Sequence, residues 1–163
     1  MLPYQEPPAV TARVSTAADR DRITDIMATS FWDDPTWGPL FGEGDRRAMA
    51  GAVLGFMARS ATRYPWVLIS SGGESVSVWI PPGGEEMASY EHRPFERLIQ
   101  DELGPGADVV LETLELFEQA RPTDRPHFYL SLLGTHEDSR GHGIGMGLLA
   151  ENLRRVDALH MPS

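Results

Sequence analysis

Residues 132–149 read Leu-Leu-Gly-Thr-His-Glu-Asp-Ser-Arg-Gly-His-Gly-Ile-Gly-Met-Gly-Leu-Leu, and this stretch is the most informative part of the chain. It places a glycine-rich turn between an apolar segment and a segment with apolar residues at helical spacing, Leu149, Leu153 and Val156. The first turn of a helix leaves backbone N–H groups without intrahelical partners, and the helix dipole favours negative charge there. Glycines let the backbone approach a phosphate closely. The stretch therefore predicts a strand, a diphosphate-binding loop and a helix.

The glycine spacing distinguishes between classes of diphosphate ligand. A dinucleotide fingerprint needs a third glycine three residues after the second. If Gly141 and Gly143 are the first two glycines, the third position is Met146; if Gly143 and Gly145 are the first two, it is Leu148. A Walker A loop needs a lysine, and all 14 basic residues are arginine. The loop does fit the pattern Gln/Arg-x-x-Gly-x-Gly/Ala, as Arg140, Gly143 and Gly145. The alternative is a glycine-rich turn that only joins the helix to the sheet.

The rest of the chain predicts one α/β domain over residues 1–163. A capping-box pattern opens a helix near residue 16, and the turn residues 71–74 separate the two strands of a hairpin. Residues 1–9 are expected to form a loose arm, residues 85–125 a helical insertion, and residues 127–160 the strand–loop–helix unit. This order predicts a mixed central sheet that contains an antiparallel hairpin and is flanked by helices. The expected strands are 12–14, 66–70, 75–80 and 127–133, and the expected helices are 16–34, 46–63, two within 85–125, and one after residue 145.

Composition narrows the class of protein further. The absence of cysteine excludes disulfides, a thiolate zinc site and a cysteine nucleophile. No apolar run is long enough for a membrane helix and no signal peptide is visible, which predicts a cytoplasmic protein without membrane partners. The net charge of −10 disfavours nucleic acid and would attract small cationic amines. The alternative is that this acidity serves solubility alone.

With these motifs, the chain resembles the GNAT superfamily of N-acetyltransferases, and within it the puromycin-type actinobacterial enzymes. The resemblance implies the GNAT fold and an acyltransferase that moves an acetyl group from acetyl-CoA to a primary amine of a small, cationic acceptor. The amine would attack directly, without a metal. The other interpretation is a non-catalytic acyl-CoA-binding or regulatory module. The loop carries most of the resemblance, with looser support from residues 14–19, 75–81 and 126–134.

The resemblance also implies roles for single residues. Backbone groups of Leu133, Gly134 and Thr135 would pair with pantetheine and hold the acetyl carbonyl. Tyr129 is the catalytic candidate, as a base or as a residue that positions water, and the alternative is an aromatic residue that lines the cleft. Main-chain N–H groups of the loop would bind the pyrophosphate, namely those of Arg140, Gly141, His142, Gly143, Ile144 and Gly145.

Three further expectations concern other parts of the chain. His136 and His142 have no third partner at metal-ligand spacing, so no metal site is expected. Phe31, Trp32, Trp37 and Phe41 either wall an amine pocket or pack in the core. The C-terminal part of the GNAT fold is expected to be missing after Ser163, which implies a truncated chain, an expression fragment, or a variant that borrows the segment from another subunit, as in a homodimer.

Overall fold

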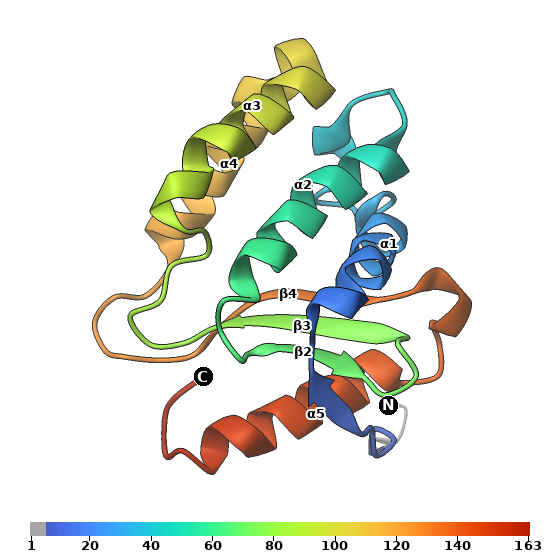
Figure 1. The fold of residues 1–163 in the computed structure, drawn as a ribbon, viewed down its shortest axis with the longest axis vertical. Coiled ribbons are helices and arrows are strands. Elements are labelled where there is room, and N and C mark those ends of the chain that lie inside the picture. Colours follow the sequence, from blue (N-terminus) through green and yellow to red (C-terminus); the bar gives the residue numbers. More distant parts are fainter. Residues whose placement is uncertain (1–5) are drawn as a thin grey trace, which may run out of the picture.

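The computed structural model describes residues 6–163, which form a four-stranded sheet with helices on both faces (Figure 1). The strand order is β1-β2-β3-β4, and each neighbouring pair is antiparallel. The α/β fold class is confirmed, while the parallel pairs of a mixed sheet do not occur among residues 6–163. The strands are β1 Ala12–Val14, β2 Val67–Ser70, β3 Ser75–Ile80 and β4 Tyr129–Thr135, and the helices are α1 Arg20–Phe31, α2 Arg46–Ala61, α3 His92–Leu103, α4 Ala107–Ala120 and α5 Ile144–Asp157.

The predicted helix start near residue 16 is a capped 3-10 turn that leads into α1. Asp19 accepts hydrogen bonds from the Thr16 N–H at 2.7 Å and from the Thr16 hydroxyl at 2.9 Å. Arg13 of β1 donates two more, at 2.7 and 2.6 Å. These donors hold the pKa of the Asp19 carboxyl far below its usual range, with the arginine contributing most. The turn is thereby tied to the first strand.

Two apolar cores lie on opposite faces of the sheet. Helices α1 and α2 cover one face, where Val76, Val78 and Ile80 alternate along β3 and point toward them. Helix α5 covers the other face and buries Val156 against Trp79 and neighbouring aromatic residues (Figure 1). No helix among residues 6–163 is long and apolar enough to cross a membrane.

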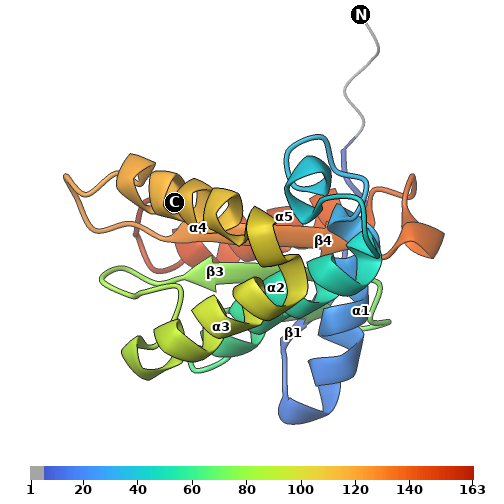
Figure 2. The same cartoon turned by 90° about the horizontal axis from the view of Figure 1, so that it is seen from above.

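Helices α3 and α4 occupy the long connection between β3 and β4. They form an antiparallel pair that rises beside α2 from one end of the sheet, opposite α1 and the glycine-rich loop (Figures 1 and 2). Phe95 of α3 packs on Phe56 of α2, with ring centroids 5.1 Å apart. Phe117 of α4 packs edge-on against Trp37, at 5.8 Å. The connection therefore forms part of the main core rather than a detached flap.

Strand β4 contains a bulge. Val78 pairs with Leu132 and Trp79 pairs with Leu130, so Ser131 has no partner residue in β3. An extra residue of this kind bends its strand and breaks the regular ladder, and such bulges are frequent beside active sites. Together, the bulge and the loop at the end of β4 indicate a candidate functional site along this strand.

Candidate active site

The loop after β4 exposes a row of backbone donors. Within residues 6–163, none of the N–H groups from Gly141 to Met146 has a hydrogen-bond partner, and the first bond of the helix runs from the Gly147 N–H to the Gly143 carbonyl. Gly141 and Gly143 adopt positive φ angles of 81° and 74°, a region that glycine enters without strain. Consecutive free N–H groups at a helix N-terminus form an anion-binding geometry. The loop therefore fits a diphosphate.

Arg140 has a different environment from the rest of the predicted loop. Its N–H already donates to the Glu137 carbonyl at 3.3 Å. Its guanidinium donates to the Thr29 and Ser30 carbonyls at the end of α1, at 2.5 and 3.0 Å. The arginine of the pattern thus anchors the loop to α1. Arg47 of α2 adds a second anchor through a bidentate pair with Glu137, at 2.7 and 2.5 Å.

Three glycines in and beside the loop serve close packing rather than open space, and a Cβ on the first, Gly143, would lie 2.8 Å from Pro8 Cδ. A Cβ on Gly145 would lie 2.6 Å from the Thr135 hydroxyl oxygen, and one on Gly147 would lie 2.3 Å from the Pro8 carbonyl oxygen. The absence of side chains there lets α5 approach the end of β4 and the N-terminal segment. Around Gly141, by contrast, nothing lies within 4 Å of an added Cβ. The open side of the loop is therefore at Gly141, and the lack of a side chain at Gly145 lets the helix pack against the strand.

Strand β4 lies at the edge of the sheet formed by residues 6–163. The His136 N–H donates to Glu74 beside β3 at 2.8 Å, while the Thr135 carbonyl points away from β3 and accepts from Ser30 at 3.0 Å. Because backbone groups alternate along a strand, those of Thr135 and Leu133 face the free edge, and those of Gly134 face β3. An extended chain of amides can pair with this edge, next to the loop.

A carboxyl group that the sequence analysis missed faces the bulge. Glu86 follows the turn after β3, and the Ser131 hydroxyl lies near enough to lower the pKa of its carboxyl. Burial raises the pKa of Glu86 above its ordinary value, Glu118 raises it further, and Ser131 and Arg121 partly oppose the shift. Arg63, at the end of α2, donates to the Glu86 backbone carbonyl at 3.3 Å. A carboxyl with a raised pKa beside a strand bulge is suited to accept a proton near neutral pH.

Tyr129, the predicted catalytic residue, lies near Glu86. Burial raises the pKa of its phenol, and the negative charge of Glu86 adds to the shift. The phenol therefore stays protonated at neutral pH and suits a hydrogen-bond donor better than a base. The guanidinium of Arg121 lies over its ring, 5.3 Å from the centroid. A catalytic role for Tyr129 stays a prediction.

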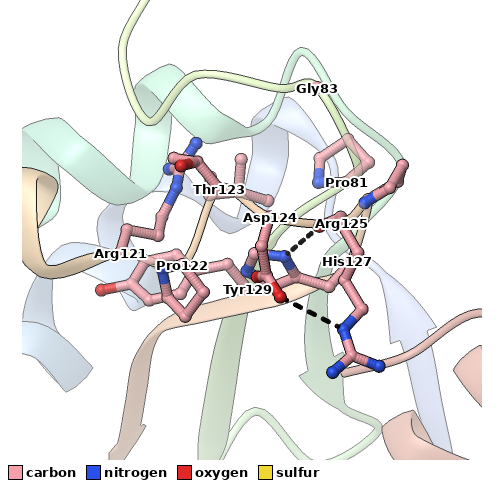
Figure 3. A pocket seen from close by; sticks show the side chains of 11 residues that line it. Pro81, Gly83, Arg121, Pro122, Thr123, Asp124, Arg125, His127 and Tyr129 are labelled. Carbon is pink, nitrogen blue, oxygen red and sulfur yellow. Dashed lines mark hydrogen bonds and ion pairs between the residues drawn. The ribbon is translucent and has the colours of Figure 1, made fainter.

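Tyr129 also lines a small cavity of about 310 Å³ at the start of β4, shown in Figure 3. The segment 121–127 forms much of its wall and carries both charge signs, with Arg125 3.7 Å from Asp124. His127 is held by a 3.0 Å contact between its Nδ1 and the Arg125 carbonyl. The mixed charges give this cavity no clear preference for a cation or an anion.

The remaining candidates are accounted for by local contacts. His136 accepts from the Asp138 N–H through Nδ1, and its Nε2 lies 3.3 Å from Asp25, whereas the His142 ring lies on the exposed loop. No group of side chains within residues 6–163 has the composition of a metal site. Among the aromatic residues, Trp37 stacks on the fully buried Phe41, which supports core packing for that pair.

No family model and no curated protein matches the sequence. A crystal structure described as histone acetyltransferase HPA2 and related acetyltransferase from Corynebacterium glutamicum superimposes with a TM-score of 0.56 over 91% of this chain and 72% of that chain, at 20% identity. The chain has the fold of this acetyltransferase. A second crystal structure, of an acetyltransferase, gives a TM-score of 0.41 at 16% identity, over 93% of this chain and 76% of the other.

At this level of identity the likeness establishes the acetyltransferase fold alone. The finer resemblance to puromycin-type enzymes stays a prediction. Within the fold, β4, its bulge at Ser131 and the loop before α5 form one continuous path along the sheet edge.

Proposed function

We propose that the protein is an acetyl-CoA-dependent N-acetyltransferase that acts on a primary amine. One observation carries the proposal: the unpartnered N–H groups from Gly141 to Met146 adjoin the free edge of a bulged strand in an acetyltransferase fold. The loop suits the pyrophosphate of coenzyme A, and the edge at Leu133 suits the amides of its pantetheine arm. Acetyl-CoA supplies the activated acetyl group when bound.

The chain's own residues then have distinct tasks along this path. The loop binds the anionic end of the coenzyme, and the edge of β4 directs the extended arm toward the bulge. Near Ser131, an amine that attacks the acetyl carbonyl has to be neutral, and the Glu86 carboxylate is placed to accept its proton. Tyr129 is placed to donate a hydrogen bond in the same region. No step requires a metal.

Coenzyme binding is tested by comparing ligands on the intact chain. Coenzyme A should raise the melting temperature more than NAD or ATP at equal concentration, since a ligand that binds only the folded state stabilises it. Isothermal titration calorimetry gives the corresponding dissociation constants. Equal stabilisation by all three ligands, or none by coenzyme A, would contradict the assignment.

A matched pair of variants tests the loop itself. His142 is exposed, and its ring makes only a 3.4 Å contact with the Ser139 carbonyl. His142→Glu adds a negative charge beside the predicted diphosphate and should weaken coenzyme A binding about tenfold, which corresponds to about 1.4 kcal/mol. His142→Gln changes the side chain without adding charge and should stay within about twofold of the wild type. Equal affinity in both variants would show that the diphosphate binds elsewhere.

The second candidate function is a non-catalytic acyl-CoA-binding module. It is favoured by the absence, among residues 6–163, of a second strand beside the free edge of β4. Thiol release from acetyl-CoA, measured with and without a panel of primary amines, separates the two functions. A protein that binds acetyl-CoA but acetylates none of the amines is the module.

A further inference from the structure

A second hollow, larger than the one beside Tyr129, lies among the helices of the insertion. It has a volume of about 600 Å³ and is called here the α3–α4 groove. Its apolar lining combines two methionines with residues of α3 and α4. The apolar residues are Met57, Met87, Phe95, Leu111 and Leu114.

The remaining lining of the groove is almost entirely acidic. Carboxylates come from the segment after β3, from α3 and from α4, together with one histidine, His92. They are Glu85, Glu86, Glu96, Asp108, Glu112, Glu115 and Glu118. Of these seven carboxylates, only Glu118 forms a salt bridge within residues 6–163, to Arg121 at 3.4 Å. No arginine is among the residues that line the groove, so negative charge dominates it and its natural occupant is a cation.

The spacing of the α4 carboxylates indicates the shape of that cation. Asp108, Glu112, Glu115 and Glu118 all line the groove, and they span about 15 Å along the helix axis at 1.5 Å per residue. Their separation of three or four residues is roughly one helical turn, about 5.4 Å, and three- or four-carbon spacers between amines have a similar length. A chain with regularly spaced ammonium groups would place each beside a carboxylate, with its methylenes on the apolar floor.

The groove approaches the candidate active site at one end. Glu86 lines the groove, and its carboxyl also faces Ser131 at the β4 bulge. Figure 1 shows α4 descending from its N-terminus to the side of the sheet, and Glu118, near the C-terminal end of α4, lines the groove. An extended occupant would thus present one end to the edge of β4.

We propose that the α3–α4 groove is the acceptor site, that it binds a linear aliphatic polyamine, and that Glu86 and Ser131 receive the terminal amine beside β4. This inference rests on the proposed acetyl transfer. A compact polyhydroxylated amine has the charge but lacks methylenes for the apolar floor. A single aliphatic amine has the apolar chain but leaves most of the carboxylates unpaired.

The chemical step balances with these residues. The terminal ammonium gives one proton to the Glu86 carboxylate, and the neutral nitrogen forms a bond to the acetyl carbonyl carbon. The carbon–sulfur bond breaks, the thiolate leaves with the electron pair, and it takes up the second proton released by the nitrogen. Glu86 returns its proton to solvent, so the products are the N-acetylated polyamine, coenzyme A and one proton.

Calorimetry with spermidine on the intact chain tests the groove separately from coenzyme binding. Removing two groove charges with Glu112→Gln and Glu115→Gln should weaken spermidine binding about tenfold or more. The control, Asp101→Asn with Glu102→Gln, removes two exposed charges of α3 outside the groove and should change the affinity less than about twofold. Coenzyme A affinity should be unchanged in both double variants, and an aminoglycoside should bind wild type more weakly than spermidine.

Each outcome decides the proposal. Equal loss of spermidine affinity in both double variants would indicate attraction by net charge alone and would overturn the proposal that the groove binds the polyamine. A lack of spermidine binding to the wild type would overturn it as well. If the groove double variant is not folded by circular dichroism, Glu115→Gln alone replaces it, with an expected loss of about threefold. Spermidine binding without coenzyme A binding would retain the groove and refute the proposed function.

Discussion

Glu86 is held in a position that costs stability, which makes it the most informative single residue. Its carboxyl is partly buried, its pKa is raised by that burial and by Glu118, and only Ser131 and Arg121 oppose the shift. A raised carboxyl pKa means that the folded protein disfavours the ionised form compared with the unfolded chain. The ionised carboxylate therefore destabilises the fold at neutral pH, which agrees with the proposed role of Glu86 in proton transfer.

Replacing Glu86 with Gln should thus raise stability and abolish most of the activity. At pH 8 the free energy of unfolding should rise by about 0.5–2 kcal/mol. The gain should shrink as pH falls through the folded pKa and vanish below the ordinary glutamate pKa of about 4.3, where both states are protonated. Acetylation should fall by about 10²–10⁴-fold.

Denaturant melts from pH 4 to pH 8, together with initial rates of thiol release, check both effects. The exposed Glu102→Gln is the control, and it should leave stability within about 0.5 kcal/mol and the rate unchanged. A Glu86→Gln protein that is less stable and still active would show that the carboxyl has a structural role.

At the scale of elements, the contact between α5 and β4 sets the geometry of the loop. The helix begins against Thr135 because Gly145 has no side chain there. Thr135 is β-branched and its hydroxyl lies 3.1 Å from that of Ser75, so it has little freedom to move aside. The loop and the strand edge are thereby held at a fixed separation.

A double-mutant cycle tests this contact. Gly145→Ala should destabilise the protein by about 1–3 kcal/mol, although alanine favours helices, because its Cβ would meet the Thr135 hydroxyl. In a Thr135→Ala background the same change should cost at least 1 kcal/mol less, since the hydroxyl is gone. Urea unfolding of the four proteins gives the coupling energy, and additive effects would mean that α5 relaxes freely.

The elements also show how far local patterns predict the structure. The loop between β4 and α5 could be predicted from glycine spacing and helix periodicity, because both are local properties of the chain. The predicted strands and helices were found close to their expected ranges. The bulge at Ser131 and the approach of Glu86 depend on which residues of β3 and β4 pair, and no local pattern contains that register. Neither the anchoring role of Arg140 nor the packing role of Gly145 could be predicted for the same reason.

For the molecule as a whole, the dominant property is the net charge of −10. The two proposed substrates carry opposite charges, so the long-range field should attract a polyamine and repel coenzyme A. The loop N–H groups are fixed dipoles that act at short range, and they leave the long-range repulsion in place. The two substrates should therefore respond oppositely to salt.

Raising the salt concentration from about 20 mM to 500 mM should lower kcat/KM for spermidine by about tenfold or more, as screening shortens the range of the attraction. The association rate of coenzyme A should stay constant or rise. Stopped-flow binding and steady-state kinetics measure the two trends, with potassium chloride as the only variable. A parallel fall for both substrates would contradict the electrostatic argument.

The open edge of β4 has a consequence for the behaviour of the protein in solution. Unpaired backbone groups along an edge strand are a template on which another chain can add a strand, which is a route to aggregation. Within residues 6–163 the C-terminal segment pairs only with the residue just before β4, where the Pro162 carbonyl accepts a hydrogen bond from the Phe128 N–H at 2.8 Å. A coenzyme lying along the remainder would act as a molecular cover. The ligand would then preserve the shelf life and solubility of the protein as well as take part in its chemistry.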